Sequence, residues 1–258
     1  MNKNTLIVVG SGIKFMSHLT IESKACIEKS DKVLYLVNEP AMQSWIEQAN
    51  KSAESLDFLY TKHKARHDNY LLIAEYIFDN LKKYETLCVV MYGHPTVFAQ
   101  PALYATNMAI QNGYNAVIMP GISSEDCLYA DLRIDPGSCG CQSFEATDFI
   151  IYRRVYDSSS HLILWQSSVI GVLNQPGYHD PLNGLAILVE YLSEKYSLDH
   201  EIVVYEAAQY PGFKPKIDKV LLRALAQTKI GRIATLYVPP NKQPIPDLVM
   251  LEKIKKIT

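Results

Sequence analysis

A polar segment in the first third of the chain carries residue types that can move protons. Tyr60, Arg66 and Tyr70 stand in the run Tyr60-Thr-Lys-His-Lys-Ala-Arg66-His-Asp-Asn-Tyr70. Because Arg66 and Tyr70 are four residues apart, they would share one face of a helix. A guanidinium beside a phenol favours the phenolate, so Tyr70 would accept a proton and Arg66 would steady a developing oxyanion. The same run also fits a solvated basic helix start capped by Asp68, and the spacing alone leaves both interpretations open.

A second candidate is the loop Tyr92-Gly-His-Pro-Thr-Val-Phe98. The apolar run Leu87 to Met91 before it is typical of a fully buried strand. Gly93 and Pro95 end that strand abruptly, because glycine accepts positive φ and proline offers no N–H to a sheet. In an open α/β sheet, ligands bind just outside the carboxyl ends of the strands. The loop is therefore predicted to cradle a ligand, with an ordinary strand-to-helix turn as the alternative.

Strand and helix signals alternate along the part of the chain that must position these two segments. This alternation is typical of βαβ units around a mostly parallel sheet, so the predicted fold class is α/β. Strands are expected at 5–9, 32–37, 87–91 and 115–119, and helices at 20–29 (with Thr20 as N-cap), 68–83, 99–112 and 123–132.

The pattern changes after Pro120-Gly121, which indicates a second, smaller domain. Further strands are expected at 149–152, 161–165, 202–205 and 233–238, with a helix at 183–196 and an amphipathic turn at 247–256. The predicted domains are 1–119, with the Tyr and Arg residues, 120–240, which completes the ligand cleft, and a short tail at 241–258.

Composition narrows the function classes. The 258 residues are 48% hydrophobic, which is enough for a large core, and 25 Lys and Arg balance 27 Asp and Glu to a net charge of -2. Such balance argues against a nucleic-acid partner, and no apolar run approaches the roughly 20 residues of a membrane span. Five scattered cysteines and the absence of a signal-peptide pattern favour a reduced, cytoplasmic protein.

Several other motifs lack residues that their usual function requires. Gly10-Ser-Gly12 follows a strand, but the third glycine of a dinucleotide fingerprint would fall near Phe15 and is missing. Cys139 and Cys141 lack partner ligands for zinc, so no metal is expected. Gly-x-Ser-x-Gly is also missing, which leaves hydrolase chemistry without a nucleophile elbow.

Four segments together resemble the tetrapyrrole-methylase superfamily of S-adenosylmethionine (SAM)-dependent methyltransferases. They are Val8-Val-Gly-Ser-Gly-Ile13, Tyr92-Gly-His-Pro-Thr-Val-Phe98, Met119-Pro-Gly-Ile-Ser-Ser-Glu-Asp-Cys-Leu128 and Thr235-Leu-Tyr-Val-Pro-Pro240. The resemblance implies a two-domain fold with a mostly parallel sheet in the N-terminal domain and a mixed sheet in the C-terminal domain. Tetrapyrrole enzymes usually carry Gly-Asp-Pro where this chain has Gly93-His-Pro95, which counts against a porphyrinoid substrate.

The chain is more similar to the borosin peptide backbone α-N-methyltransferases. Their long motif is matched by Pro120-Gly-Ile-Ser-Ser-Glu-Asp-Cys-Leu-Tyr-Ala-Asp-Leu-Arg-Ile-Asp-Pro136, which is followed by Phe144-Glu-Ala-Thr-Asp-Phe149. The family's catalytic Tyr, Arg and Tyr have counterparts at Tyr60, Arg66 and Tyr70, and Tyr92 would align the substrate amide with the cofactor's methyl group. The resemblance implies SAM as cofactor, S-adenosylhomocysteine as product and a SAM site between the domains. The implied SAM contacts are Tyr92, Pro95, Val97, Ser123, Ser124, Gln166, Ala207 and Thr235, with the loop 10–12 nearby.

The resemblance also implies the partners. Fungal members fuse the methyltransferase to a clasp and to their own substrate peptide, whereas this chain has neither motif after Pro240. It is therefore expected to act in trans on a separate ribosomal precursor, as the enzyme of a split system for ribosomally synthesized and post-translationally modified peptides (RiPPs). A homodimer that binds two precursor chains as a heterotetramer is expected, with iterative peptide N-methylation. The alternatives are a corrin or porphyrin C-methyltransferase and a non-catalytic module that binds SAM and a peptide.

Overall fold

The computed structural model describes residues 4–60, 66–173 and 181–257, with only the backbone described for Arg66. Its contacts divide the chain into two compact units. Of the described residues, unit 1 contains 4–133, Leu173 and 207–215, and unit 2 contains 134–172, 181–206 and 216–257. The two units are described separately below.

Unit 1 is built on a parallel sheet with the strand order β3-β2-β4-β1-β5. In every neighbouring pair the strands run in the same direction, and Gly10 at the end of β1 lies opposite Met91 at the end of β4. The strands are β1 (Thr5–Gly10), β2 (Lys32–Leu36), β3 (Glu54–Ser55), β4 (Thr86–Met91) and β5 (Asn115–Ile118).

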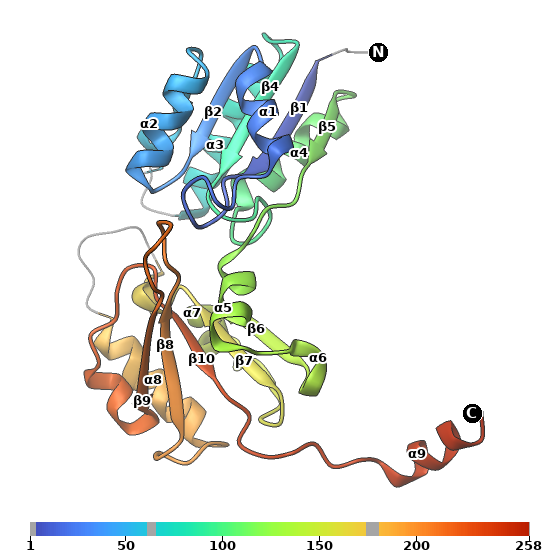
Figure 1. Ribbon diagram of the computed structural model, residues 1–258, viewed down its shortest axis with the longest axis vertical. Coiled ribbons are helices and arrows are strands. Elements are labelled where there is room, and N and C mark those ends of the chain that lie inside the picture. The colour runs from blue at the N-terminus through green and yellow to red at the C-terminus, as the bar shows by residue number, and fades with distance from the viewer. Residues whose placement is uncertain (1–3, 61–65, 174–180, 258) are drawn as a thin grey trace. The chain divides into compact units, whose positions relative to one another are not determined.

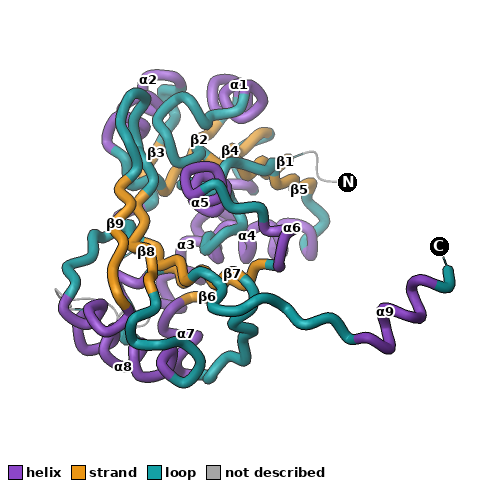
Figure 2. The backbone as a smooth tube through the Cα atoms, turned by 60° about the horizontal axis from the view of Figure 1, so that its bottom comes forward, coloured by secondary structure: helices purple, strands orange, loops and turns teal. Residues whose placement is uncertain are grey.

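Helices cover both faces of this sheet, as Figures 1 and 2 show. Helices α1 (Ile21–Lys29) and α2 (Pro40–Ala49) pack on one face, and α3 (Arg66–Leu81) and α4 (Gln100–Gln111) pack on the other. Alternate residues of β4 enter the two cores, since Val89 packs with α3 and α4 while Val90 packs with α1 and α2. A strand buried on both faces must be apolar at consecutive positions, which explains the run Leu87 to Met91.

The loops after β1 and β4 leave the sheet toward opposite faces. The loop after β1 leads to α1 on one face, and the loop after the neighbouring β4 leads to α4 on the other. Adjacent parallel strands whose connections diverge in this way form the switch point at which open α/β sheets bind ligands. The fold therefore places the predicted loop 92–98 at a binding edge of the sheet.

Helix α5 (Ser124–Leu132) belongs to unit 1 by its contacts. The predicted boundary at 119/120 assigned this helix to the second domain, whereas the contacts divide the chain after Arg133. Its Cys127 Sγ lies 3.9 Å from Nδ1 of His18, in the loop after β1, which ties the helix to unit 1.

Unit 2 contains a mixed sheet with the strand order β6-β7-β10-β8-β9. Strand β6 pairs with β7 in parallel, and the remaining pairs are antiparallel. Its elements are α6 (Pro136–Cys139), β6 (Cys141–Glu145), α7 (Ala146–Ile151), β7 (His161–Trp165), α8 (Leu182–Ser193), β8 (Glu201–Glu206), β9 (Lys216–Leu221), β10 (Thr235–Val238) and α9 (Leu248–Lys255). The parallel and mixed sheets confirm the predicted two-domain α/β fold.

The strand predicted at 149–152 is wrong. Residues Ala146–Ile151 form helix α7, whose first turn is capped by the Glu145 carboxylate accepting the Asp148 N–H at 2.6 Å. Phe149 is fully buried and its ring lies 5.1 Å from that of Tyr191 on α8. A short apolar run does not distinguish strand from helix, so the cap and the core contact decided the outcome.

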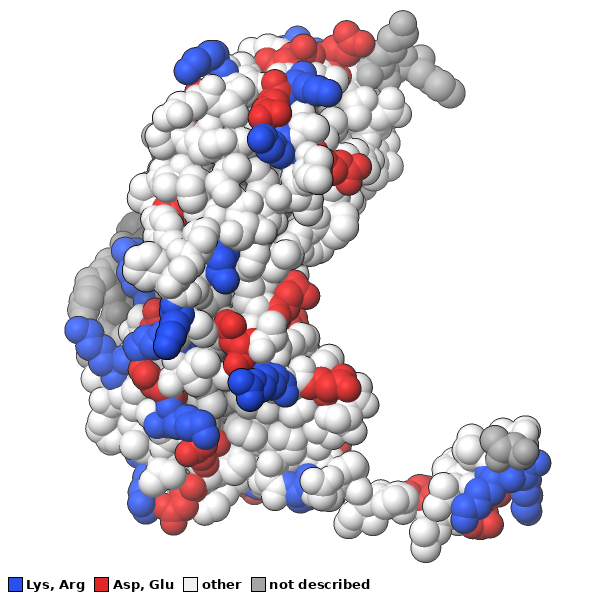
Figure 3. Space-filling view, viewed as in Figure 1, with Lys and Arg blue, Asp and Glu red and all other residues white. Residues whose placement is uncertain are grey.

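The surface carries charges of both signs. On the face in Figure 3, Lys and Arg side chains alternate with Asp and Glu side chains. Among the described helices, none is long and apolar enough to cross a membrane.

Candidate functional site

Four glycines bring the end of β1 and the loops after β1, β4 and β5 into backbone contact. A Cβ on Gly10 would lie 2.2 Å from the Gly93 carbonyl oxygen and 3.3 Å from the Gly121 Cα atom. Gly12 and Gly93 exchange backbone hydrogen bonds of 3.2 Å in both directions, and Gly93 has a φ of +70°. No other residue type fits so close an approach. The glycine contact therefore fixes the edge on which the predicted ligand loop stands.

Tyr92 leaves β4 directly at this contact. Its N–H donates to the Leu36 carbonyl at 3.1 Å, which anchors it to the end of β2. Burial raises the pKa of its phenol, with a further contribution from Cys127 and Glu39, while a hydrogen bond from Gln209 opposes the rise. A phenol with a raised pKa keeps its proton near neutral pH. Tyr92 is therefore suited to donate a hydrogen bond rather than to act as a base.

The rest of the loop is folded back on itself. The His94 Nδ1 atom accepts the Thr96 N–H at 3.2 Å, and the Val97 N–H donates to the His94 carbonyl at 3.2 Å. Pro95 is buried, and its Cδ atom lies 3.0 Å from the position of a Cβ on Gly10. His94 thus has a structural part in shaping the turn that carries Pro95 and Val97.

Tyr60 and Tyr70 lie together at the start of α3. Tyr60 ends a short 3-10 turn, Asp57–Leu59, that follows β3, and Tyr70 lies in the first turns of α3. Their ring centroids are 6.1 Å apart, with the rings inclined at 53°. Segments that follow parallel strands emerge at the carboxyl-terminal edge of the sheet, so both phenols lie at the edge that carries Tyr92. The side chain of Arg66, the third predicted residue, lies outside the described residues.

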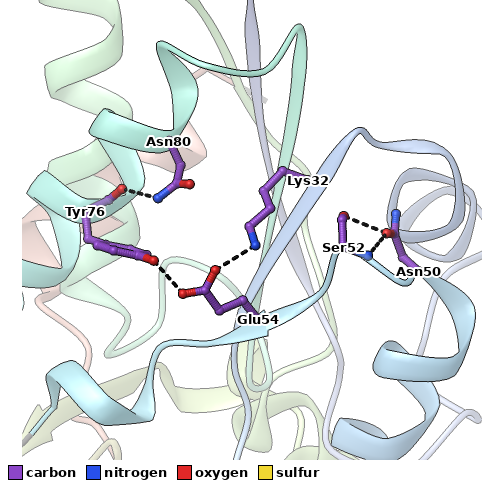
Figure 4. Close-up of polar contacts among 6 residues, drawn as sticks. All are labelled: Lys32, Asn50, Ser52, Glu54, Tyr76 and Asn80. Atoms are coloured by element: carbon purple, nitrogen blue, oxygen red, sulfur yellow. Dashed lines mark hydrogen bonds and ion pairs between the residues drawn. The ribbon is translucent and has the colours of Figure 1, made fainter.

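A polar brace holds the elements on both sides of this tyrosine pair (Figure 4). Glu54 of β3 accepts a hydrogen bond from Lys32 of β2 at 2.6 Å and another from the Tyr76 hydroxyl of α3 at 2.5 Å. Asn80 donates to the Tyr76 carbonyl at 2.9 Å. Burial raises the pKa of the Glu54 carboxyl, but the two hydrogen bonds outweigh it and hold that pKa below its ordinary value. The brace ties β3 to α3 and so fixes the distance that Tyr60 and Tyr70 must span.

The predicted pair Ser123 and Ser124 has two different environments. The Ser123 hydroxyl donates to the Asp126 carboxylate at 2.7 Å and accepts the Asp126 N–H at 3.3 Å, which forms a capping box on α5. Its own N–H also donates to that carboxylate at 2.7 Å. For Ser124, no hydrogen bond from its hydroxyl to another described residue is present. Ser124 is therefore the member of the pair whose hydroxyl can serve a ligand.

The segment 207–215 completes this part of unit 1, and sequence reasoning identified only Ala207 in it. The Gln209 carbonyl accepts the Phe15 N–H at 2.8 Å, and the Gln209 side chain donates to the Tyr92 hydroxyl at 3.5 Å. The Tyr210 hydroxyl donates to Glu39, whose carboxylate also caps α2. No periodicity or motif links residue 209 to residue 92, so only the tertiary structure reveals Gln209.

Gln166 and Thr235 lie on neighbouring strand ends within unit 2. Gln166 follows β7 with a left-handed φ of 55°, a conformation that non-glycine residues adopt mainly where the surroundings enforce it. Thr235 begins β10, which runs antiparallel to β7, and it is buried. The Ser167 hydroxyl donates to the Ala234 carbonyl at 2.9 Å and ties the two ends together.

The predicted cofactor residues have chemistry that suits SAM. In unit 1 the Ser124 hydroxyl can bond a polar group of the ligand, while the Tyr92 ring, Pro95, Val97 and Ala207 offer apolar contact. In unit 2, Gln166 and Thr235 offer an amide and a hydroxyl. The amino end of α5 favours a carboxylate, since its backbone N–H groups and dipole point outward there. In unit 1 the positions of Tyr92 and Pro95 depend on the glycine contact, because a Cβ at Gly10 would displace the loop that carries them.

Comparison with known proteins identifies relatives over most of the chain. The family described as Tetrapyrrole (Corrin/Porphyrin) Methylases matches residues 5–220. A methyltransferase and ribosomally synthesized type I borosin cyclic peptide precursor from Coprinopsis marcescibilis is 38% identical over 92% of this chain and 62% of that protein. A methyltransferase and cyclic peptide gymnopeptides precursor from Gymnopus fusipes is 37% identical over 97% of this chain and 61% of that protein. The chain thus spans about three fifths of the length of these relatives.

Solved structures share the fold at low sequence identity. Uroporphyrin-III-C-methyltransferase from Thermus thermophilus superposes with a TM-score of 0.65 at 15% identity, over 92% of this chain and 93% of that one. A diphthine synthase superposes with a TM-score of 0.64 at 13% identity, over 98% of this chain and 95% of that one. At such identities the likeness is one of fold alone.

Proposed function

The chain belongs to the tetrapyrrole (corrin/porphyrin) methylase family, and we propose that it transfers methyl groups from SAM to backbone amide nitrogens of a ribosomally made peptide. The observation that carries the proposal is the contact of the Tyr60 and Tyr70 rings at the ligand-binding edge of the sheet. The names of the relatives, which include borosin cyclic peptide precursors, support a peptide substrate. A tetrapyrrole C-methyltransferase has no evident use for this pair of phenols, and Gly93-His-Pro95 also departs from the usual tetrapyrrole motif.

The main obstacle to this reaction is the low nucleophilicity of the amide nitrogen. Its lone pair is delocalised into the carbonyl group, which keeps the peptide planar. Methylation therefore requires removal of the N–H proton and stabilisation of negative charge on the carbonyl oxygen. Both demands can be met by phenols and a guanidinium placed around one peptide unit.

We assign the roles of base and of oxyanion donor to residues before and at the start of α3, and the role of aligning the amide to Tyr92. Tyr70 is the base that removes the amide proton, and Arg66, four residues earlier on the same helix, favours its phenolate. Arg66 and Tyr60 hold the carbonyl oxygen as charge develops on it. Tyr92 retains its proton because burial raises its pKa, so it serves to align the amide for transfer.

SAM, when bound, supplies an electrophilic methyl group on its sulfonium. The residues proposed to hold it are Tyr92, Pro95, Val97, Ser123, Ser124 and Ala207 of unit 1 and Gln166 and Thr235 of unit 2. Of the serines, Ser124 gives the hydrogen bond, while Ser123 shapes the helix end that presents it. S-adenosylhomocysteine is the expected product.

The proposal includes how the substrate is supplied. The peptide is a separate precursor chain, methylated iteratively by a homodimer that binds two precursors as a heterotetramer. None of the five cysteines, all of which lie within the described residues, forms a disulfide, which fits a reducing location such as the cytoplasm.

The test uses the purified chain, SAM and candidate precursors. The chain is co-expressed with each short open reading frame that adjoins its gene, and both products are examined by tandem mass spectrometry. Methyl groups on backbone nitrogens of the separate peptide support the proposal, whereas methyl groups found only on the enzyme's own polypeptide contradict the separate-substrate part. Light scattering of the purified enzyme and its complex measures whether they are a dimer and a heterotetramer.

A second arm separates the alternative activities. The same enzyme is incubated with uroporphyrinogen III, and methylated tetrapyrrole together with unmodified peptides would favour the C-methyltransferase. Calorimetry with SAM distinguishes the remaining case, because a chain that binds SAM and peptide without forming S-adenosylhomocysteine is a binding module. Lack of SAM binding would refute all three readings.

A further inference from the structure

Gln209 lies outside the predicted site, and its side chain reaches Tyr92. Its Nε2 atom donates a hydrogen bond to the Tyr92 hydroxyl oxygen at 3.5 Å, across a sequence separation of 117 residues. It is half-buried, as is Tyr92. Both residues lie in unit 1, so the contact is internal to one compact unit.

The segment around Gln209 is anchored without the help of this side chain. The Gln209 main-chain carbonyl accepts the Phe15 N–H at 2.8 Å. The Tyr210 hydroxyl donates to Glu39, and the Tyr210 ring lies 6.4 Å from the Phe15 ring.

Glu39 is a firm anchor for Tyr210. It is 3% exposed, and its carboxylate accepts the Ala41 and Met42 N–H groups at 2.9 and 2.7 Å. The main chain is fixed in this way, and the hydrogen bond that the described residues give the Gln209 side-chain amide is the one to the Tyr92 hydroxyl.

The hydrogen-bond chemistry gives this contact a direction. A phenol has one proton and two lone pairs, and an amide NH₂ group can donate but cannot accept. When Gln209 occupies one lone pair, the Tyr92 proton must point to an acceptor other than the Gln209 nitrogen. The other groups that act on Tyr92 are Cys127 and Glu39. The Glu39 carboxylate is already committed to Tyr210 and to the cap of α2.

We propose that Gln209 is a positioning residue that orients the Tyr92 hydroxyl, so that its proton is directed to the carbonyl oxygen of the substrate amide. This inference rests on the proposed function for the identity of the acceptor. Gln209 itself touches neither the substrate nor SAM in this assignment. Its effect on the reaction passes through the Tyr92 hydroxyl.

The first test observes Tyr92 without any methyl transfer. The chain is labelled with tyrosine carrying ¹³C at the ζ position, and the Tyr92 resonance is assigned as the one lost in Tyr92→Phe. The variant Gln209→Met removes the donor at similar length, and Gln209→Glu replaces it with an acceptor. Both should move the Tyr92 resonance at neutral pH, with shifts that differ between the two variants. Gln48→Met, at an exposed position of α2, should leave it in place.

The second test is a double-mutant cycle on kcat/KM with the precursor peptide. Gln209→Met should lower kcat/KM about 3- to 10-fold, the range expected for one uncharged hydrogen bond. In the Tyr92→Phe background the same change should have no further effect, because the hydroxyl through which it acts is absent. The dissociation constant of SAM, measured by calorimetry, should be the same in Gln209→Met and wild type.

The outcomes separate this inference from the proposed function. An unmoved Tyr92 resonance in Gln209→Met, or additive effects in the cycle, overturns the positioning role whatever the activity. A moved resonance with no transfer to any peptide upholds the orientation of the hydroxyl and overturns the proposed function, and with it the acceptor named above.

Discussion

The rings of Tyr60 and Tyr70 lie 6.1 Å apart, one at the end of the turn after β3 and the other in the first turns of α3. Nine residues separate them along the chain, and the five at 61–65 lie outside the described residues. The elements that flank the two tyrosines, β3 and α3, are held together by the hydrogen bond between Glu54 and Tyr76. The tyrosine pair and this brace lead to the first two predictions.

Removal of the Tyr70 hydroxyl should abolish most methyl transfer. A general base contributes about 10²- to 10⁴-fold, so Tyr70→Phe should lower kcat by at least about 10² with little change in SAM affinity. Tyr60→Phe and Arg66→Ala should each lower kcat by about 10², as expected for loss of one group that stabilises the oxyanion. Product formation is measured by mass spectrometry. Tyr84→Phe, before the amino end of β4, is the matched control, and wild-type rates in both Tyr70→Phe and Arg66→Ala would contradict the assignment.

Replacement of Glu54 should change how stability depends on pH. Its pKa is lowered in the folded state, so its contribution is complete above the ordinary pKa and is lost as the pH falls through the lowered value. Glu54→Gln should therefore unfold more easily near neutral pH and lose less stability than wild type between about pH 5 and pH 2. Urea unfolding at a series of pH values measures this difference. If the unfolding free energy of Glu54→Gln fell with pH in the acid range as steeply as that of wild type, Glu54 would not be the source of that pH dependence. Glu75→Gln, at an exposed position on α3, controls for the loss of a carboxylate.

A methyl group on Gly10 should disrupt the ligand-binding edge. Because the new Cβ would lie 2.2 Å from the Gly93 carbonyl oxygen, Gly10→Ala must displace one of the loops, at a cost of about 1–3 kcal/mol. SAM binding by calorimetry should be weakened or lost while circular dichroism still reports a folded chain. Gly113→Ala is a fair control, because its Cβ meets nothing within 4 Å and only its φ of +77° is strained. Equal SAM affinities in both variants would contradict the role given to Gly10.

Substitution of Ser123 should affect mainly stability, and substitution of Ser124 should affect mainly SAM binding. Ser123→Ala removes the N-cap of α5 and should cost about 1 kcal/mol of unfolding free energy. Ser124→Ala should leave stability within about 0.5 kcal/mol and weaken SAM about 3- to 10-fold. Thermal unfolding and calorimetry on the two variants form a matched pair. If Ser123→Ala alone weakened SAM without a loss of stability, the assignments would have to be exchanged.

Much of the fold follows from local sequence signals. The run Leu87 to Met91 forms the predicted strand, and Thr20 caps the predicted helix by accepting the Ser23 N–H at 3.0 Å. The helix predicted at 183–196 and the tail turn at 247–256 are also present, as α8 and α9. The strand at 149–152 failed because burial of Phe149 against α8 favoured a helix, which a four-residue window cannot reveal.

The sequence by itself determined the strand-and-helix alternation, the loop after β4 and the motifs that place the chain in its family. These properties depend on residue type and on neighbours a few positions away. Only the tertiary structure decided which predicted residues meet. It showed that Gly10 and Gly93 touch and that Gln209 contacts Tyr92. Both contacts join residues far apart in the chain. Gly10 meets Gly93 because the carboxyl ends of neighbouring parallel strands share one edge, and Gln209 reaches Tyr92 from the segment after β8, which no local pattern records.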